Sequence, residues 1–246
     1  MKYIALIPTR LESKRLPGKA LLDLDGLPII VHTAKRAMLA KKIHEVYVCT
    51  DSLKIIKACK KYNIKTIKTK KNFENGTERI ASISEKFKND VIIDVQGDEP
   101  LIEPIFIDKL ITHYEKLKIK PDIIVPHHKI LKVDKKSIVK LVFSSNNRVL
   151  YFSRSTIPYD VNQNSIHLFK HLSVILFSNK ALKKYIKLKK SSLEIKEDIE
   201  LLRALENGFY ISTFEIKGSS FSIDIKDDFI RAKNLIENDK YRKLYK

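Results

Sequence analysis

The sequence predicts an α/β protein with a mostly parallel central sheet. In the first half of the chain, short apolar or alternating runs alternate with segments of helical pattern. Strands that alternate with helices indicate a parallel sheet that has helices on both faces. The length of 246 residues and the hydrophobic content of 43% allow one large α/β domain with a buried core.

The first half contains the most regular elements. Its predicted strands are YIALIP (3–8), EVYVCT (45–50), IKTIKT (64–69) and DVIIDVQ (90–96). Its predicted helices begin near Pro28, Ser52, Thr77 and Pro104. Ligands of open parallel sheets bind at the carboxyl ends of the strands. The loops that follow the first and fourth strands are therefore the first candidates for a site.

The second half is less regular. Its predicted strands are DIIVPHH (122–128), HLSVILFS (171–178) and SFSIDI (220–225), with a hairpin over 138–153 that turns at residues 145–147. Its predicted helices are 179–188, 194–206 and 227–239, and Asn207-Gly208 is a typical stop for the second. Repeats, linkers and low-complexity blocks are absent from the sequence, so 1–246 is interpreted as a single domain.

The formal net charge of +19 first suggests a nucleic-acid-binding protein. Lysines, however, are scattered through nearly every segment and far outnumber arginines, as expected when an AT-rich genome biases codon choice. The aromatic residues are not interleaved with the basic runs as base-stacking platforms are. We therefore expect no nucleic-acid partner, although the charge favours anionic small substrates.

The remaining composition points to a cytoplasmic protein. The sequence has neither an apolar run long enough to span a membrane nor the pattern of a signal peptide. Cys49 and Cys59 are too few for a disulfide framework and lack zinc-binding spacing, so we expect reduced thiols.

The loop after the first strand, within IPTRLESKRLPGK (7–19), is unusually cationic. Its basic side chains are Arg10, Lys14, Arg15 and Lys19. Pro17-Gly18 predicts a tight turn, and the cations together with backbone N–H groups can surround phosphate oxygens. The GxxxxGK[ST] and GxGxxG motifs are absent, which argues against the usual ATPase and dinucleotide sites. A solvated turn is the alternative interpretation.

Two further loops carry candidate residues. Asp98 in QGDEP, after the fourth strand, is a suitable oxygen ligand for Mg²⁺, and Asp224 in SIDI supplies a second acid for phosphoryl or nucleotidyl transfer. In NGTERI (75–80), Gly76 allows close approach to a ligand and Thr77 can cap a helix. The alternative interpretation of both loops is structural: Asp98 and the NGTERI segment would each cap the helix that follows, without binding a metal or a ligand.

Several segments resemble one known family. They are IPTRLESKRLPGKALLDLDGLPIIVHTAKRA, NGTERI, VQGDEPLI, LYFSRSTIPYD, KHLSVILFS, LLRALENG and FSIDIKDDFIRA. In their order and approximate spacing, these segments resemble the 3-deoxy-manno-octulosonate (Kdo) cytidylyltransferase family, the CMP-Kdo synthetases. The resemblance extends from about residue 3 to about residue 237. The combination of SxRLPGK, GTER and QGDEP is its most specific part.

The resemblance implies a cytoplasmic, Mg²⁺-dependent enzyme that converts CTP and Kdo to CMP-Kdo and pyrophosphate for lipopolysaccharide biosynthesis. It implies a Rossmann-like nucleotidyltransferase fold, usually a homodimer, in which about 125–190 contribute the sugar side and the dimerisation region. The resemblance implies neither a nucleic-acid partner nor insertion into a membrane.

Individual residues receive roles through the same resemblance. The implied nucleotide-binding residues are Pro8, Arg10, Ser13, Arg15, Lys19, Gly76, Thr77, Glu78 and Arg79. The implied sugar-binding residues are Gln96, Arg154, His171 and Glu200. Asp98 and Asp224 are the implied Mg²⁺ ligands, and the catalytic group is Arg10, Lys19, Asp98 and Asp224.

The chain departs from the family pattern mainly on the sugar side. Ile175 stands where relatives usually carry an aromatic residue, and Leu201 stands where they carry glutamine. Phe73 replaces a frequent histidine on the nucleotide side. A lost hydrogen-bonding partner can change discrimination among sugars. An 8-amino-3,8-dideoxy analogue of Kdo is therefore a second candidate substrate.

Two other classes of function stay open at this point. One is a nucleotidyltransferase of the same fold that acts on a nine-carbon ulosonic acid or a sugar 1-phosphate. The other is a non-enzymatic protein that binds RNA or an anionic surface, as the high net charge of +19 first suggests.

Overall fold

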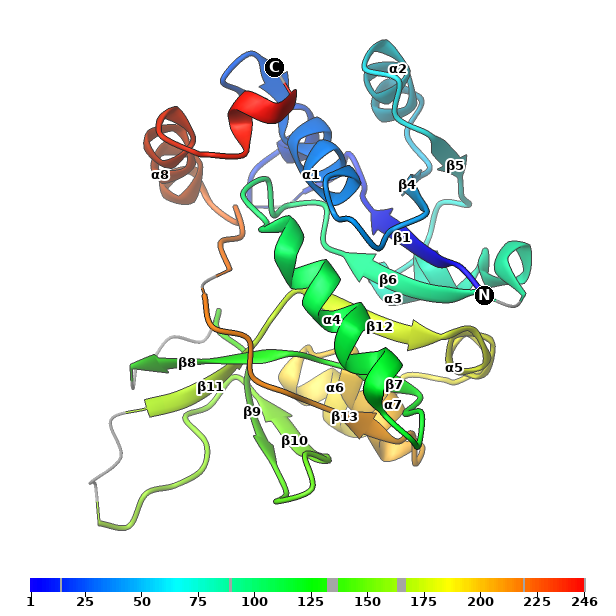
Figure 1. The fold of residues 1–246 in the computed structure, drawn as a ribbon, viewed down its shortest axis with the longest axis vertical. Coiled ribbons are helices and arrows are strands. Elements are labelled where there is room, and N and C mark those ends of the chain that lie inside the picture. Colours follow the sequence, from blue (N-terminus) through cyan, green and yellow to red (C-terminus); the bar gives the residue numbers. More distant parts are fainter. Residues whose placement is uncertain (14, 89, 132–136, 163–166, 219, 246) are drawn as a thin grey trace.

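A seven-stranded sheet forms the centre of the computed structural model (Figure 1). The structure describes residues 1–246 except 14, 89, 132–136, 163–166, 219 and 246. The strand order in this sheet is β13-β7-β12-β6-β1-β4-β5. A four-stranded sheet, β10-β9-β11-β8, lies beside it, and β2 and β3 form a small hairpin.

The strands are β1 (Tyr3–Pro8), β2 (Asp23–Leu24), β3 (Leu27–Pro28), β4 (Glu45–Thr50), β5 (Thr66–Lys68), β6 (Val91–Val95), β7 (Ile123–Ile124), β8 (His127–Leu131), β9 (Lys140–Phe143), β10 (Val149–Ser153), β11 (His167–His171), β12 (Val174–Ser178) and β13 (Ile211–Ser212). The α-helices are α1 (Ile29–Met38), α2 (Leu53–Lys61), α3 (Gly76–Ala81), α4 (Pro104–Lys116), α5 (Asn179–Tyr185), α6 (Ser192–Glu197), α7 (Leu201–Glu206) and α8 (Lys226–Glu237). Short 3₁₀ helices are η1 (Lys19–Leu21), η2 (Ser84–Phe87) and η3 (Arg242–Tyr245).

The central strands are parallel, which confirms the predicted fold class. β1 pairs in parallel with both β4 and β6, and β4 pairs in parallel with β5. β12 is the exception, because it runs antiparallel to β6 and β7. The carboxyl ends of β1, β4 and β6 consequently lie at one edge of the sheet, where the loops that begin at Thr9, Asp51 and Gln96 leave it.

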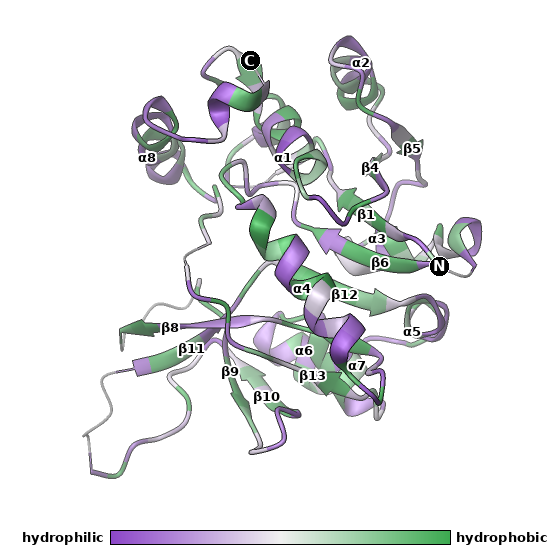
Figure 2. Ribbon diagram, viewed as in Figure 1, coloured by the Kyte–Doolittle hydropathy of each residue, from purple (hydrophilic) through white to green (hydrophobic). Residues whose placement is uncertain are grey.

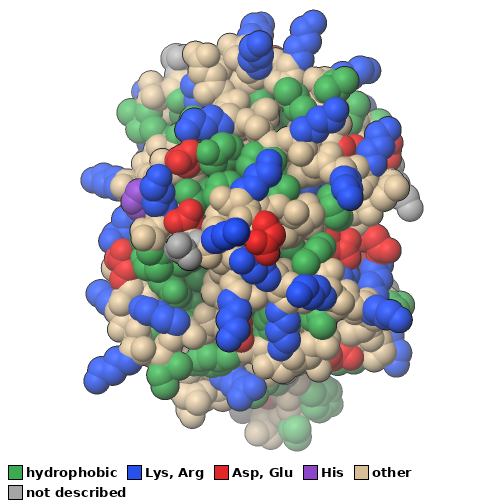
Figure 3. Space-filling model, turned by 90° about the vertical axis from the view of Figure 1, so that its right-hand side faces the viewer, with side chains coloured by type: hydrophobic (Ala, Val, Ile, Leu, Met, Phe, Trp, Pro, Cys, Tyr) green, Lys and Arg blue, Asp and Glu red, His purple; other side chains and the backbone are tan. Residues whose placement is uncertain are grey.

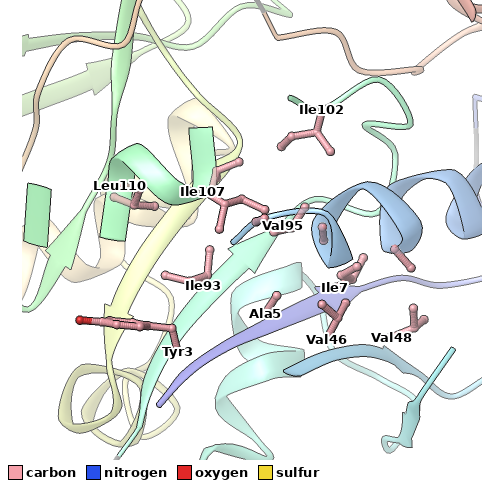
Figure 4. Close-up of a cluster of buried hydrophobic side chains, with 14 of the residues drawn as sticks. Tyr3, Ala5, Ile7, Val46, Val48, Ile93, Val95, Ile102, Ile107 and Leu110 are labelled. Carbon is pink, nitrogen blue, oxygen red and sulfur yellow. The ribbon is translucent and has the colours of Figure 1, made fainter. Parts of the chain in front are cut away.

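Helices cover both faces of this sheet, which explains why its strands read as almost continuous apolar runs. All six residues of β1 are buried. On one face, Ile93 and Val95 of β6 pack with Ile107 and Leu110 of α4, and residues of α1 and α2 join the same cluster (Figure 4). On the other face, the core includes residues of α3, α5 and α7. Figure 2, which colours hydrophobic residues green, shows hydrophobic stretches along the central strands.

The four-stranded sheet is antiparallel and is built from the middle of the chain. β9 and β10 form the predicted hairpin, and Asn147 in its turn has a φ of 62°. β11 pairs with β8 so that His171 lies opposite His127 and Lys170 lies opposite His128. β11 was not predicted as a separate strand, since its sequence HLFKH mixes polar and apolar residues.

Three element predictions were wrong in detail. The expected strand 122–128 is two strands, β7 and β8, which belong to different sheets. The expected helix 194–206 is divided into α6 and α7 by Asp198, which has a φ of 52° that ends α6. Residues 220–225 form no strand, because Ile223 N–H donates to the Asp98 carbonyl at 3.0 Å and so joins the loop after β6.

The surface is rich in lysine and arginine. On the face drawn in Figure 3, these side chains are spread from top to bottom with Asp and Glu among them. Among the helices that the structure describes, none is both long and apolar enough to cross a membrane.

Candidate active site

Three distant parts of the chain meet at the carboxyl edge of the sheet. Lys19, at the start of η1, places its Nζ 2.7 Å from Asp98 Oδ2 and 3.6 Å from Asp224 Oδ1. The same Nζ donates to the Ile223 carbonyl at 2.6 Å. The two acids that the sequence analysis expected at one site therefore lie around a single ammonium group.

The cationic loop is shaped by its turn residues. Gly18 has a φ of 67°, a left-handed conformation that favours glycine, and its carbonyl accepts from Leu21 N–H at 2.8 Å. Ser13 Oγ accepts from Leu16 N–H at 3.3 Å, so Ser13 also stabilises the loop. The loop thus turns directly into η1, which positions Lys19.

The other loop cations are more exposed than Lys19. Arg15 Nη2 donates to Asp224 Oδ1 at 2.8 Å and reaches the same carboxylate as Lys19. Arg10 is exposed on the same loop, two residues after β1 ends. Lys14 lies outside the described residues. Flexible exposed cations beside a fixed one are suited to a ligand with several anionic oxygens.

Two glycines bring backbone close to Pro8 at the end of β1. A Cβ on Gly76 would lie 3.0 Å from Pro8 Cγ, and a Cβ on Gly97 would lie 2.9 Å from the Pro8 carbonyl oxygen. Real Cβ atoms rarely come this close to other atoms. A side chain at Gly97 would push the loop after β6 away from Pro8, and one at Gly76 would push the start of α3 away from it.

Arg79 and Glu78, both predicted to bind nucleotide, have protein partners in this structure. Arg79 Nη1 lies 2.8 Å from Asp51 Oδ1 and donates to Thr69 Oγ1 at 2.5 Å. Glu78 Oε1 lies 2.8 Å from Arg203 Nη2. Both side chains therefore hold α3 against neighbouring elements, and their direct role in nucleotide binding stays a prediction.

Arg203 is the centre of a buried ion network. Its side chain on α7 binds Glu194 of α6 through two hydrogen bonds, of 2.7 and 2.6 Å, and also pairs with Glu78 of α3. Only 2% of Arg203 and 4% of Glu194 are exposed. The network joins three helices that surround the site.

We expect Arg203→Ala to lower the free energy of unfolding by about 3–5 kcal/mol, because it leaves two largely buried carboxylates without their cation. Urea denaturation of both proteins measures the difference. Arg148→Ala, which truncates an exposed arginine in the β9–β10 turn, is the control and should change stability by less than about 0.5 kcal/mol. A loss of similar size in both variants would contradict a structural role for the network.

Gln96 and Glu200, two residues predicted to face the sugar, lie near the GTER segment. A Cβ on Gly76 would lie 3.5 Å from Gln96 Nε2, and Glu200 accepts from Thr77 N–H at 3.3 Å. Burial raises the pKa of the Glu200 carboxyl, although its hydrogen bonds to Thr77 oppose this rise. Thr77 therefore belongs to the same corner of the site as these two residues.

Arg154 and His171, the other two predicted sugar residues, lie at the ends of β10 and β11. Arg154 donates from Nε to the Glu197 carbonyl at 2.7 Å and from Nη2 to the Asp198 carbonyl at 2.8 Å. Burial lowers the pKa of His171 to about 4, and the nearby charges of Lys170 and Arg154 act in the same direction. His171 is therefore a neutral ring at neutral pH.

The two sugar-side departures are buried core residues. Ile175 and Leu201 are each 3% exposed and belong to the cluster that packs on the α3, α5 and α7 side of the sheet. Ile175 on β12 lies opposite Asp94 on β6, and Leu201 directly follows Glu200. They form apolar walls beside polar groups of the site.

Sequence reasoning missed two acidic residues at this edge. Asp51 follows β4 and pairs with Arg79, and its position after a parallel strand is the signal that was used for Asp98. Asp94 lies inside β6, where a carboxylate within the apolar run VIIDV was itself a signal. Its side chain is fully buried.

The site combines a cationic loop, a carboxylate after a parallel strand and a second carboxylate from the loop before α8, an arrangement that suits nucleotidyl transfer. Residues 4–217 match the family described as Cytidylyltransferase, and the chain belongs to this family. The chain is 36% identical over 245 residues to a 3-deoxy-manno-octulosonate cytidylyltransferase of Chlorobium phaeobacteroides (strain BS1), covering 97% of this chain and 98% of the relative.

Two more similarities extend this result. An 8-amino-3,8-dideoxy-manno-octulosonate cytidylyltransferase of Shewanella pealeana (strain ATCC 700345 / ANG-SQ1) is 36% identical over 217 residues, covering 86% of this chain and 89% of the relative. A solved structure of a CMP:2-keto-3-deoxy-manno-octonic acid synthetase complexed with CTP has a TM-score of 0.90 at 32% identity, covering 96% of this chain and 99% of that one. The family resemblance and the nucleotidyltransferase fold are confirmed.

Proposed function

We propose that this protein transfers the cytidylyl group of CTP to a 3-deoxy-octulosonic acid, either Kdo or its 8-amino analogue, and releases pyrophosphate. The CMP-linked sugar acid is the activated form for lipopolysaccharide biosynthesis. The observation that carries the proposal is the meeting of Lys19, Asp98 and Asp224 at the carboxyl edge of the sheet. The near full-length similarity to Kdo cytidylyltransferases supports these substrates.

Mg²⁺ is the cofactor that we propose, held by Asp98 and Asp224. These carboxylates already share one positive charge, the Lys19 ammonium, so their oxygens point to a common place. Among the described residues there is no group of three or more acidic, histidine or cysteine ligands. Two carboxylates suit Mg²⁺ when substrate phosphates and water complete its shell. A bound ion there neutralises charge on the triphosphate and polarises the α-phosphorus.

The loop cations stabilise the leaving pyrophosphate in this proposal. The anomeric hydroxyl of the sugar acid forms a bond to the α-phosphorus, while the bond from that phosphorus to the pyrophosphate oxygen breaks. Negative charge grows on the leaving group, and Arg10, Arg15 and Lys19 are placed on one loop to bind it. Arg15 and Lys19 bind carboxylates in this structure, so CTP binding exchanges those partners for phosphate oxygens.

The sugar acid is bound on the other side of Asp98 in this proposal. Arg154 supplies a positive charge for its carboxylate, and backbone carbonyls of residues 197 and 198 hold the guanidinium in place. His171 contributes a neutral ring, because burial keeps its pKa at about 4. Gln96 and Glu200 complete the site with hydrogen bonds to sugar hydroxyls.

We also propose a homodimer that works in the cytoplasm, where CTP is available. Large apolar side chains on and next to the four-stranded sheet support the dimer, since Leu150 is 56% exposed, Tyr159 84% and Val161 79%. Sedimentation measurements should give about twice the chain mass of 28.5 kDa.

A pyrophosphate-release screen tests the proposed function. The purified protein is given CTP, UTP or ATP with Mg²⁺ and, in separate reactions, Kdo, its 8-amino analogue, a nine-carbon ulosonic acid or a sugar 1-phosphate. We expect release with CTP and an octulosonic acid. Faster release with another nucleotide, or with a sugar 1-phosphate, would contradict the proposal and assign the chain to a different nucleotidyltransferase activity.

A further inference from the structure

Asp94 is a buried carboxyl group in the middle of the central sheet. It is the only polar residue of β6, whose sequence is VIIDV, and its exposed fraction is 0%. Asp94 lies on the same strand face as Gln96, because side chains two residues apart in a strand point the same way. The antiparallel partner directly opposite is the apolar Ile175.

One of its two oxygens is satisfied and the other is not. Gln96 Nε2 donates to Asp94 Oδ2 at 3.1 Å. Oδ1 is buried and has no hydrogen-bond partner within the part of the chain that the structure describes. Buried polar atoms are almost always hydrogen-bonded, so a buried carboxyl oxygen without a partner calls for an explanation.

The surroundings of Asp94 are acidic rather than basic. Burial raises the pKa of Asp94 well above its ordinary value, and the negative charge of Glu200 raises it further. No lysine or arginine among the described residues forms an ion pair with Asp94 or Glu200. Asp98 and Asp224, by contrast, are paired with Lys19 and Arg15. The positive charge of Arg203 lowers the pKa of Glu200, but Arg203 forms its ion pairs with Glu78 and Glu194.

We propose that Asp94 and Glu200 bind a positively charged substituent, an ammonium group, on the sugar acid. This inference rests on the proposed function and specifies which octulosonic acid the site prefers. An ammonium group has three N–H donors, and Asp94 Oδ1, the Glu200 carboxylate and Gln96 Oε1 are three acceptors. Gln96 Nε2 donates a hydrogen bond to Asp94, so Gln96 Oε1 is the amide atom that remains to accept from the ammonium group.

The apolar walls strengthen this preference. Ile175 lies opposite Asp94 and Leu201 follows Glu200, so the carboxyl pair lies in a poorly solvated corner. A hydroxyl can also hydrogen-bond to the carboxyl group, but it brings no positive charge to stabilise the ionised form of Asp94 in this buried place. An ammonium group supplies both the hydrogen bond and the compensating charge. Gly76 packs closely beside this corner, since a Cβ there would lie 3.5 Å from Gln96 Nε2.

The test compares kcat/KM for 8-amino-3,8-dideoxy-octulosonic acid and for Kdo in the wild type and in Asp94→Asn. The amide keeps the size of the side chain and removes its charge. We expect the wild type to prefer the amino sugar by about tenfold or more, since hydrogen bonds to charged groups are roughly twice as strong as neutral ones. Asp94→Asn should lose this preference, because kcat/KM falls further for the amino sugar than for Kdo.

Asp108→Asn is the matched control, because Asp108 accepts backbone N–H groups of Lys41 and Lys42 on the surface of α4. It should leave the substrate ratio unchanged, and thermal denaturation verifies that Asp94→Asn is folded. Turnover of Kdo with the same sugar ratio in wild type and Asp94→Asn would overturn the inference while the proposed function stands. Absence of turnover with both sugars in the folded wild type would overturn the proposed function itself.

Discussion

Lys19→Ala is expected to lower kcat/KM for CTP by about 10²–10³-fold. Lys19 Nζ contacts Asp98, Asp224 and the Ile223 carbonyl, so its loss removes the cation that we propose for phosphate binding and also the group that joins three segments. Steady-state pyrophosphate release over a range of CTP concentrations measures the effect.

Two comparisons show whether Lys19 acts on the terminal phosphates. Binding of CMP, measured by calorimetry, should weaken much less than the use of CTP, because CMP has no β or γ phosphate. Lys19→Arg keeps the charge and should recover part of the lost activity, although a guanidinium does not reproduce the compact ammonium between two carboxylates. Equal losses for CTP and CMP would place the Lys19 side chain elsewhere in the complex.

Asp98→Asn and Asp224→Asn should each lower kcat by about 10²–10³-fold with the fold intact, because each change removes a negative charge and keeps the volume. The two acids lie on different segments but share the Lys19 ammonium, so we expect similar losses. Turnover at saturating Mg²⁺ and CTP is the measurement.

Asp227→Asn is the control for this pair. Asp227 is an exposed acid in the first turn of α8, three residues after Asp224, and its loss should change kcat by less than about twofold. Circular dichroism verifies folding of each variant. Near wild-type turnover in Asp98→Asn or Asp224→Asn would show that the altered residue is not a metal ligand.

The parallel core was predictable because its strands are buried on both faces and therefore appear as short apolar runs. β1, β4 and β6 lie within one residue of their predicted limits. The helix predicted at 194–206 failed because a local feature, the left-handed Asp198, interrupts a continuous helical pattern. The strand predicted at 220–225 failed because its alternating sequence is used to bind the loop after β6 instead of a sheet edge.

The place of Asp98 was also predictable, because it follows a parallel strand, whereas Asp224 reaches Asp98 through the Ile223 hydrogen bond and not from the predicted strand. The partners of Arg79 could not be predicted, because they depend on how α3 packs against Asp51 and Thr69. The local sequence does not encode this packing. Asp94 was overlooked for a different reason. Its place within an apolar strand is visible in the sequence, but the missing hydrogen-bond partner of its Oδ1 among the described residues is visible only in the packed structure.

Identification of the product tests the central claim most directly. The wild-type protein is incubated with CTP, Mg²⁺ and either Kdo or its 8-amino analogue, and the products are identified by mass spectrometry while pyrophosphate is quantified. We expect a CMP-linked sugar acid and one pyrophosphate for each molecule formed. Hydrolysis of CTP without a sugar nucleotide, or formation of CDP and phosphate, would contradict the assignment of Lys19, Asp98 and Asp224 to cytidylyl transfer.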